Sequence, residues 1–306
     1  MKITKSTDPQ EKPSIVMIVY GNGGVGKTTF SSTAPKPLLV DCENGAKYFG
    51  LRGIKMDVAK ISTWSDMEGL FDIAKSGEYE TIVLDPIGEL MEKLKRYMIV
   101  KGDKKLVMAD GSPTIAGWGW LKDTMRSTIK VLRDSGVNLL IVAHVEEKQD
   151  EQSLVKRPLL MTKLSDEIIN MVDIVGYMTV VNDGENGEKR IIIVDPASDK
   201  YIAKDRTGQL GKVIPPNFKD IIDACQGTKT FKWSNANAKT APAEEKSEEE
   251  KTPTDRVHDK INQAKAKKTA PKKVAKKKAE EPSDTIAEDI VNDNIGNDDE
   301  EGVEVD

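Results

Sequence analysis

The stretch SIVMIVYGNGGVGKTT, from Ser14 to Thr29, decides the fold of this chain. Its first seven residues are apolar and rich in β-branched side chains, which is typical of a buried strand. A glycine-rich turn follows, and a helix is expected to begin at Lys27. Such a turn lets backbone N–H groups surround an anion next to the positive end of a helix. The stretch therefore predicts a phosphate-binding loop.

The loop also has the spacing of a nucleoside triphosphate site. GNGGVGKT matches the pattern G-x-x-x-x-G-K-[ST], in which the lysine reaches the β and γ phosphates and the hydroxyl of the last residue binds Mg²⁺. These roles fall on Lys27 and Thr28, and we expect ATP and Mg²⁺ as cofactors. The expected nucleotide-binding residues are Gly21, Asn22, Gly23, Gly24, Val25, Gly26, Lys27, Thr28 and Thr29.

A second apolar run, TIVLD, ends at Asp85. This is the Walker B pattern, in which a buried strand delivers one carboxylate beside the Mg²⁺ ion. An aspartate at the end of a strand can also simply begin a turn. With the phosphate loop present, we expect Thr28 and Asp85 to bind the metal together.

Two further strand ends carry candidate catalytic residues. Glu43 follows the expected strand Pro37 to Val40, and it could orient or deprotonate the attacking water if that strand is next to the first or one removed. Asp41 is the alternative, and either carboxylate could instead belong to a surface turn. His144 ends the run NLLIVAH and could contact the γ-phosphate, or it could be an ordinary hydrogen-bonded histidine.

The remaining apolar runs indicate the fold class. Strands at 81–84 and 137–143 are each preceded by a helix-like segment, which predicts parallel strands joined by crossover helices. The runs 172–181 and 190–194 flank the turn-rich NDGENG and predict a β-hairpin at the sheet edge. We therefore expect an α/β core of three layers, with a mostly parallel sheet and an edge hairpin.

Two stretches fit neither helix nor strand cleanly and are expected to be long loops, where function tends to concentrate. Residues 102–120 (GDKKLVMADGSPTIAGWGW) follow the TIVLD strand and its helix. Residues 146–163 follow the strand that ends at His144.

Charge divides the chain into parts. The whole sequence of 306 residues has a net charge of −5, and the acidic excess lies after residue 234. Lys260 to Lys278 contains nine lysines and no acidic residue, whereas Glu281 to Asp306 contains eleven acidic residues and no basic one. Such a segment buries too little apolar surface to fold. We expect a flexible N-terminus at 1–12, an ATPase domain at 13–234 and a disordered charged tail at 235–306.

Cysteine content and the length of apolar stretches indicate the cellular compartment. Cys42 and Cys225 have neither the number nor the spacing of a disulfide framework or a zinc site, which favours a reducing compartment. The longest apolar stretches are far too short to span a bilayer. The chain is expected to be cytoplasmic, in the host cell if a phage encodes it, with no membrane partner.

In motif order, residues 14–218 resemble the RecA superfamily of P-loop ATPases. That resemblance implies that the acidic residue of a strand-end D-x-E activates water, and Asp41-Cys42-Glu43 matches it at Glu43. It also implies a polar sensor at His144. The string AKDRTG is similar to the K-x-[KR] pair that RecA-like and RadA-like proteins insert into a neighbour's site, so Lys204 and Arg206 are expected to act across an oligomer interface.

The compact core resembles the small phage-encoded RecA-like ATPases of the Sak type, which assist single-strand annealing and recombination. This implies binding to DNA, chiefly single-stranded, self-assembly into a ring or filament, and a single-strand-binding protein as a further partner. The two long loops would then occupy the positions of the DNA-binding loops of RecA. The first carries Trp118 and Trp120 near Lys104 and Lys105, and the second carries Lys148, Lys156, Arg157 and Lys163.

Other functions remain open on the sequence. The tryptophans could be core anchors rather than stacking platforms. The GGVGKTT string is also similar to that of the ParA and MinD partitioning ATPases, but these carry a lysine where this chain has Asn22. A nucleotide-gated interaction protein with little turnover, or a helicase or helicase-loading motor, would use the same phosphate site.

Overall fold

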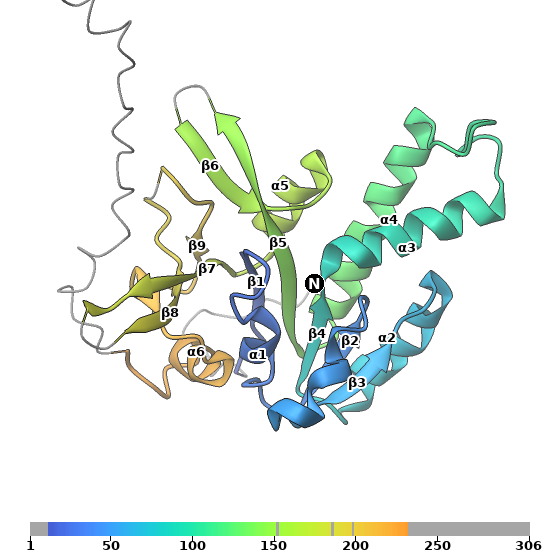
Figure 1. The fold of residues 1–306 in the computed structure, drawn as a ribbon. Coiled ribbons are helices and arrows are strands. Elements are labelled where there is room, and N and C mark those ends of the chain that lie inside the picture. Colours follow the sequence, from blue (N-terminus) through green and yellow to red (C-terminus); the bar gives the residue numbers. More distant parts are fainter. Residues whose placement is uncertain (1–11, 151–152, 185–186, 198, 232–306) are drawn as a thin grey trace, which may run out of the picture. The chain divides into compact units, whose positions relative to one another are not determined.

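The computed structural model describes residues 12–150, 153–184, 187–197 and 199–231 (Figure 1). The tail at 235–306 and nearly all of the expected flexible N-terminus lie outside the described residues. The domain boundaries therefore stay predictions.

A single mixed sheet organises the described part of the chain. Its strands follow the order β10-β8-β7-β1-β5-β4-β2-β3, with β6 paired to β5 and β9 paired to β7. Neighbours from β7 through β1, β5, β4 and β2 to β3 run parallel, as predicted from the alternating pattern. The strands are β1 Val16–Gly21, β2 Pro37–Asp41, β3 Asp57–Lys60, β4 Thr81–Asp85, β5 Asn138–Asp150, β6 Ser153–Pro158, β7 Ile174–Asn182, β8 Glu188–Ile193, β9 Lys204–Asp205 and β10 Val213–Ile214.

Helices cover both faces of this sheet, which confirms three layers. Val16, Ile18 and Tyr20 of β1 point into a core shared with α2, α3, α4 and α5. Ile15 and the alternate residues of β1 point into a second core shared with α1 and α6. The helices are α1 Lys27–Ser31, α2 Met67–Ser76, α3 Ile87–Lys101, α4 Ile115–Arg133, α5 Thr162–Met171 and α6 Phe218–Cys225, with short 3-10 turns η1 Gly45–Tyr48, η2 Gly50–Arg52 and η3 Trp64–Asp66.

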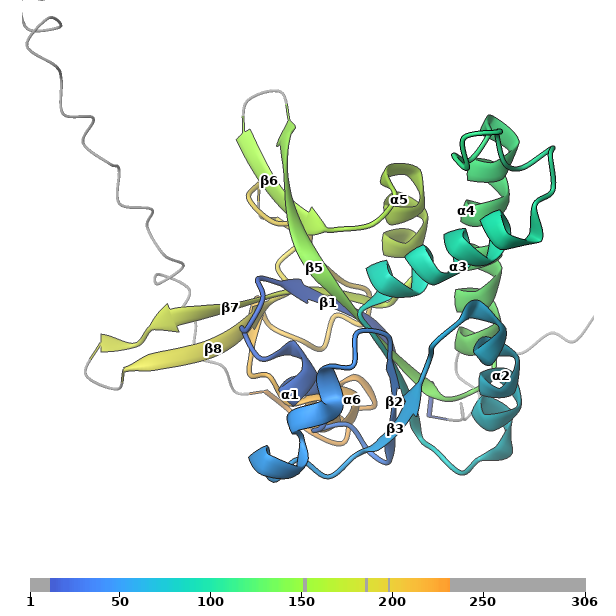
Figure 2. The ribbon, with the colours of Figure 1, turned by 45° about the vertical axis from the view of Figure 1, so that its right-hand side comes forward.

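The expected hairpin is present as β7 and β8, which pair antiparallel from Tyr177 opposite Ile193 to Asn182 opposite Glu188. Figure 2 shows the hairpin projecting sideways from the sheet. The two-residue strand β10 lies outside β8, so the hairpin is next to the edge rather than at it.

The two stretches expected to be long loops both contain regular structure. Residues 146–150 continue β5 and pair antiparallel with β6, and α5 begins at Thr162. Residues 115–120 open α4, whose N-cap Thr114 accepts a hydrogen bond from the Gly117 N–H group. The loop interpretation was therefore wrong over most of the second stretch and over residues 115–120 of the first, whereas residues 102–114 belong to no helix or strand. The β5–β6 arm and the α3–α4 pair instead extend from the side of the sheet at which β1 ends (Figure 1).

The strand before Glu43 is also farther from the phosphate loop than we expected. Both β5 and β4 lie between β1 and β2, whereas the sequence argument required β2 to be next to β1 or one removed. Only the loop after β2 can therefore bring Glu43 toward the end of β1.

Candidate nucleotide-binding site

The glycine-rich loop joins β1 to α1 at the centre of the sheet. Gly24 and Gly26 have positive φ angles of 75° and 104°, a backbone conformation that side chains with a Cβ atom seldom adopt. Gly21 is required for a different reason, because a Cβ atom there would overlap the Met178 carbonyl oxygen on β7. The turn geometry expected from the sequence is therefore the geometry observed.

Lys27 is buried inside this loop. Its Nζ atom donates hydrogen bonds of 2.8 Å to the carbonyl oxygens of Gly21 and Asn22. Burial lowers the pKa of Lys27, and the negative charges of Asp85 and Glu43 oppose that shift. These two carboxylates therefore favour the charged ammonium at the start of α1.

Thr28 and Asp85 meet at the adjacent strand end. The Thr28 hydroxyl donates a 2.7 Å hydrogen bond to Oδ2 of Asp85. Burial raises the pKa of Asp85, while the Thr28 hydrogen bond and the charge of Lys27 lower it. A hydroxyl and a carboxylate are oxygen ligands that suit Mg²⁺ together with phosphate oxygens. The pair therefore fits the expected metal ion.

No metal cluster of another kind is present in the described part of the chain. No group of three or more His, Cys, Asp and Glu side chains there could hold an ion alone. A Mg²⁺ ion at Thr28 and Asp85 would accordingly take its other ligands from phosphate and water.

The two carboxylates after β2 differ in what they contact. Asp41 is buried and accepts hydrogen bonds from the backbone N–H groups of Glu43, Gly45 and Ala46, at 3.2, 3.0 and 3.0 Å. It therefore fixes the turn after β2 and has little capacity left for a ligand. Glu43 is half-exposed, with Oε1 3.6 Å from Nε2 of His144.

His144 lies level with the start of the phosphate loop. In the parallel pairing of β1 and β5, its Cα atom is the partner of Gly21. Lys27, Asp85, Glu43 and His144 thus gather at one edge of the sheet. Their catalytic roles stay predictions, but the neighbourhood that those roles require is present.

Two arginines that the sequence analysis did not single out also contact this region. Arg190 on β8 donates from Nε to the Val25 carbonyl oxygen at 3.0 Å and lies against Gly26. Arg52, at the end of η2, donates from Nη2 to the Thr29 hydroxyl at 2.7 Å. No local motif marks either residue, because each reaches the loop only through the tertiary fold.

Lys204 and Arg206 bind within their own chain. The Lys204 ammonium donates to the carbonyl oxygens of Ile169, Asn170 and Val172, at 2.9, 3.1 and 2.7 Å, around the end of α5. Arg206 donates to the Asn170 carbonyl at 2.7 Å and is about half exposed. Both side chains therefore stabilise the α5 terminus, and their action on a neighbouring subunit stays a prediction.

The two tryptophans that were expected to bind DNA differ in their exposure. Trp118 lies on α4 with 43% of its surface exposed, and Nζ of Lys95 is 5.8 Å from its ring centre. Trp120, on the same helix, packs against the core. The anchor role that we considered for the tryptophans is therefore met by Trp120, whereas Trp118 remains accessible.

On the β5–β6 arm, acidic neighbours offset the basic residues. Lys156 lies 3.7 Å from Glu147, and Arg157 contacts Glu146 at 3.4 Å and Asp166 at 2.6 Å. These pairs reduce the positive charge that the arm can offer to a phosphate backbone.

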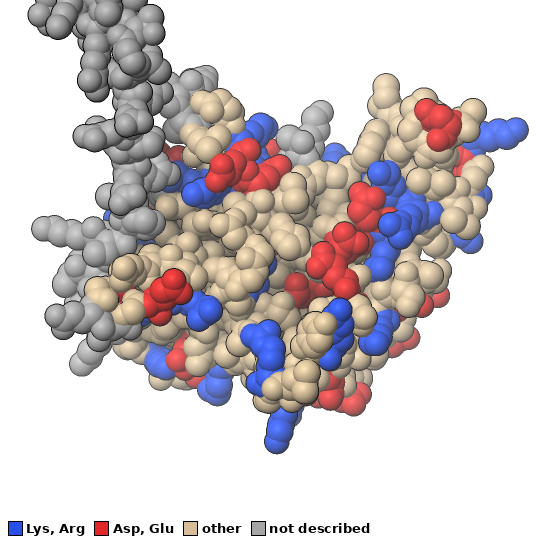
Figure 3. Space-filling view, viewed as in Figure 1, with Lys and Arg blue, Asp and Glu red and all other residues tan. Residues whose placement is uncertain are grey.

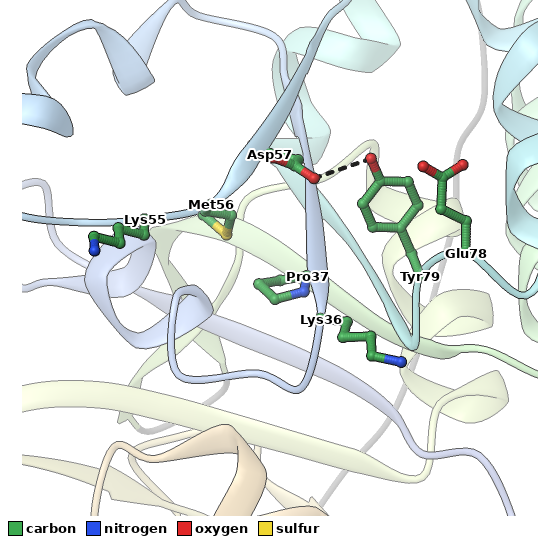
Figure 4. Close-up of a pocket in the computed structure, with 7 residues that line it drawn as sticks. All are labelled: Lys36, Pro37, Lys55, Met56, Asp57, Glu78 and Tyr79. Atoms are coloured by element: carbon green, nitrogen blue, oxygen red, sulfur yellow. Dashed lines mark hydrogen bonds between the residues drawn. The ribbon is translucent and has the colours of Figure 1, made fainter.

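A separate pocket lies away from the candidate nucleotide-binding residues. The pocket drawn in Figure 4 has a volume of about 350 Å³ and lies where β2 and β3 begin, with Pro37 and Asp57 in its wall. Tyr79 donates a 3.1 Å hydrogen bond to Asp57 there. This is the amino end of the parallel strands, opposite the phosphate loop, and no candidate catalytic residue lines it.

The sheet, the loop and the Thr28 to Asp85 contact define a P-loop nucleotide-binding protein. The chain belongs to the AAA domain family, whose profile matches residues 14–207. Over the described residues, no helix is long and apolar enough to cross a membrane.

Individual relatives are distant. The chain is 23% identical over 209 residues to the SPbeta prophage-derived uncharacterized protein YorG of Bacillus subtilis (strain 168), a match that covers 65% of this chain and 62% of that protein. The match thus spans less than two thirds of that relative. A solved structure, the KaiC-like protein PH0186 of Pyrococcus horikoshii OT3, matches with 12% identity and a TM-score of 0.35 over 58% of this chain and 77% of that one.

Proposed function

We propose that this chain binds ATP with Mg²⁺ and hydrolyses it. The observation that carries the proposal is the 2.7 Å contact between Thr28 and Asp85, directly beside a lysine held inside the phosphate loop. Two separate segments of sequence thereby supply a cation, a hydroxyl and a carboxylate to one strand edge: the phosphate loop with Lys27 and Thr28, and the end of β4 with Asp85. This is the set of groups that phosphoryl transfer needs around a triphosphate.

Each residue has a separate task in this proposal. Lys27 neutralises phosphate charge, and Thr28 and Asp85 hold Mg²⁺, which when bound supplies further neutralisation of the triphosphate. Glu43 accepts a hydrogen bond from the attacking water and orients it in line with the terminal phosphorus. His144 lies between the Glu43 side chain and the start of the loop, where it can report the γ-phosphate to the β5–β6 arm.

The test is steady-state ATP hydrolysis by the full chain and by Lys27→Ala. We expect the substitution to abolish turnover, because the cation that neutralises phosphate charge is lost. The circular dichroism spectrum should stay unchanged, because the Lys27 ammonium bonds only to two carbonyl oxygens of its own loop. Lys75→Ala is the control, since Lys75 is an exposed lysine on α2. Wild-type turnover in Lys27→Ala would refute the phosphate-site assignment.

We further propose that the ATPase acts on single-stranded DNA, as an oligomer, in phage recombination, annealing or replication, with a single-strand-binding protein as an additional partner. The prophage origin in the name of the YorG relative supports a phage setting. The accessible Trp118 with Lys95 beside it supports contact with bases and phosphates.

One comparison separates the rival activities. We expect single-stranded DNA to raise the rate of ATP hydrolysis. Unchanged, negligible turnover with DNA-independent partner binding would instead favour a nucleotide-gated interaction protein. Directional strand separation would favour a helicase or helicase-loading motor.

A further inference from the structure

A groove lies between η3 and α3. It has a volume of about 380 Å³, and its walls include Trp64 and Ser65 of η3 and Lys93, Arg96, Tyr97 and Lys101 of α3. Trp64 and Tyr97 are both half-buried, so each keeps part of its ring accessible. The groove thus combines aromatic surface with three cationic side chains.

The cations of this groove are largely uncommitted. Within the described residues, Lys93 and Arg96 form no salt bridge or side-chain hydrogen bond, in contrast to Lys95, which pairs with Glu92 on the same helix. Lys101 lies over the Tyr97 ring, with Nζ 5.2 Å from its centre. These residues can therefore bind an external anion without first breaking an ion pair.

Asp66, which follows Ser65 of the groove, forms no salt bridge with the groove cations in the described residues. Oδ2 of Asp66 accepts hydrogen bonds of 2.8 Å from the backbone N–H groups of Ser62 and Thr63. These bonds are the main reason why its pKa is lowered, and Lys93 contributes only a weaker long-range effect. Figure 3 shows lysine and arginine side chains gathered over α3, with an acidic band beside them. The positive side chains of α3 therefore lie next to acidic ones on this face (Figure 3).

We propose that the groove between η3 and α3 binds a segment of single-stranded nucleic acid, with Lys93, Arg96 and Lys101 on its phosphates and a base stacked on Tyr97 or Trp64. Aromatic faces next to unpaired cations are the combination that single strands require. A duplex would bury its bases and leave the rings without a partner. The proposal rests on the proposed action on single-stranded DNA and adds a site separate from the two stretches considered above.

The fold also connects this groove to the nucleotide site. Helix α3 begins at Ile87, two residues after Asp85, so one helix joins the metal-binding carboxylate to the groove. A strand held along α3 therefore contacts the helix that directly follows the metal-binding carboxylate in the sequence. This gives single-stranded DNA a physical route to the rate of ATP hydrolysis.

The test measures the affinity of the full chain for labelled oligothymidylate at several salt concentrations. We expect Arg96→Ala to weaken binding and to make the slope of log affinity against log salt shallower by about 0.7, the value for one lost contact to a single strand. Arg96→Lys should restore the slope. Lys75→Ala, the same loss of charge at an exposed site on α2, should leave affinity and slope unchanged.

A second pair of variants separates stacking from charge. Tyr97→Ala should weaken binding about tenfold with an unchanged salt slope, because a stacked base is lost and no cation is removed. Tyr97→Phe should bind as the wild type does. All groove variants should keep basal ATP hydrolysis, since none of these residues touches the nucleotide site.

Each outcome has one meaning. If Arg96→Ala and Tyr97→Ala both keep the wild-type affinity and salt slope, the groove does not bind the strand, and DNA binds elsewhere on the protein. No binding of oligothymidylate by the wild type would overturn the groove and the proposed DNA action together. Equal competition by polyglutamate, with no effect of Tyr97→Ala, would assign the groove to an acidic polypeptide instead. Absence of ATP hydrolysis by the wild type, with oligothymidylate binding intact, would refute the proposed ATPase activity and leave the proposed groove in place.

Discussion

Nε2 of His144 lies 3.6 Å from Oε1 of Glu43, although β5, which carries His144, and β2, which precedes Glu43, are separated by β4. The turn after β2 spans that distance because Asp41 accepts hydrogen bonds from three backbone N–H groups within it, those of Glu43, Gly45 and Ala46. The position of Glu43 therefore depends on a buried neighbour, Asp41, whose carboxylate is largely occupied by these hydrogen bonds.

This division of labour predicts different defects at the two carboxylates. Glu43→Gln should bind ATP normally but hydrolyse it about 100-fold more slowly, the usual scale for a lost general base. Asp41→Asn should lower the thermal unfolding midpoint, because an amide replaces a carboxylate that accepts three hydrogen bonds. Single-turnover hydrolysis and thermal unfolding measure the two effects. A normal rate in Glu43→Gln with loss only in a well-folded Asp41→Asn would move the catalytic role to Asp41.

Asp85 should lower stability at neutral pH. Burial is the chief reason why its folded pKa is raised above the ordinary 3.8, so the folded state favours the protonated form of Asp85. The stability that this protonated form contributes is fully present below pH 3.8 and is lost as pH rises through the folded pKa. Asp85→Asn removes that effect and can still accept the Thr28 hydrogen bond. We expect its unfolding midpoint, without nucleotide, to rise by about 2 to 4 °C at neutral pH, as for about 1 kcal/mol in a domain of this size.

The gain should shrink as pH falls through the raised folded pKa and should vanish below pH 3.8, where Asp85 is protonated in both states. Asp66→Asn is the control with the opposite sign, because backbone hydrogen bonds lower the pKa of Asp66. Its midpoint should fall at neutral pH, and the difference should disappear as pH falls through the lowered pKa. A neutral-pH midpoint for Asp85→Asn below that of the wild type would contradict the assignment of burial as the dominant effect.

Arg190 should matter for nucleotide affinity. Its Nε atom binds the Val25 carbonyl, and in the described structure its terminal guanidinium nitrogens have no hydrogen-bond partner. We expect Arg190→Ala to raise KM for ATP about tenfold, the loss of roughly one charged hydrogen bond. Arg190→Gln can keep a donor near Val25 without the charge. Equal KM values for wild type and both variants would reduce Arg190 to a surface contact.

Arg206 tests assembly. If its half-exposed guanidinium reaches a neighbouring subunit, Arg206→Ala should lower turnover, and mixing it with Lys27→Ala should restore part of it. In the mixture, one subunit supplies the arginine and the other an intact phosphate loop. Turnover that no mixing ratio restores, together with a lower unfolding midpoint, would limit Arg206 to holding the end of α5.

The sequence predicted the parts of the site that depend on local spacing. The phosphate loop, the strand ending at Asp85 and the β7–β8 hairpin follow from glycine positions and short apolar runs, and all three are present. Residues 115–120 were mistaken for a loop because Gly117 and Gly119 disguise the first turns of α4. A Cβ atom at Gly117 would overlap the Leu106 carbonyl oxygen, so that glycine serves packing and not a turn.

The remaining features of the site could not be predicted from the sequence, because they depend on the strand order and the tertiary fold. Periodicity identifies β2 but not the two strands between it and β1, so the path of Glu43 to His144 could not be foreseen. Arg190 was missed for the same reason, since it lies 165 residues from its Val25 partner. Lys204 and Arg206 fit a motif, but only the fold reveals the carbonyl groups of α5 beside them.

The central place of β1 has a consequence for synthesis on the ribosome. Its neighbours β5 and β7 begin at Asn138 and Ile174, so the strand that leads into the phosphate loop is made long before either partner strand emerges. Pairings so distant in sequence form late, because the loop between them must close first. A nascent chain stalled before Ile174 should therefore not retain ATP, and nucleotide binding would report that translation has passed β7.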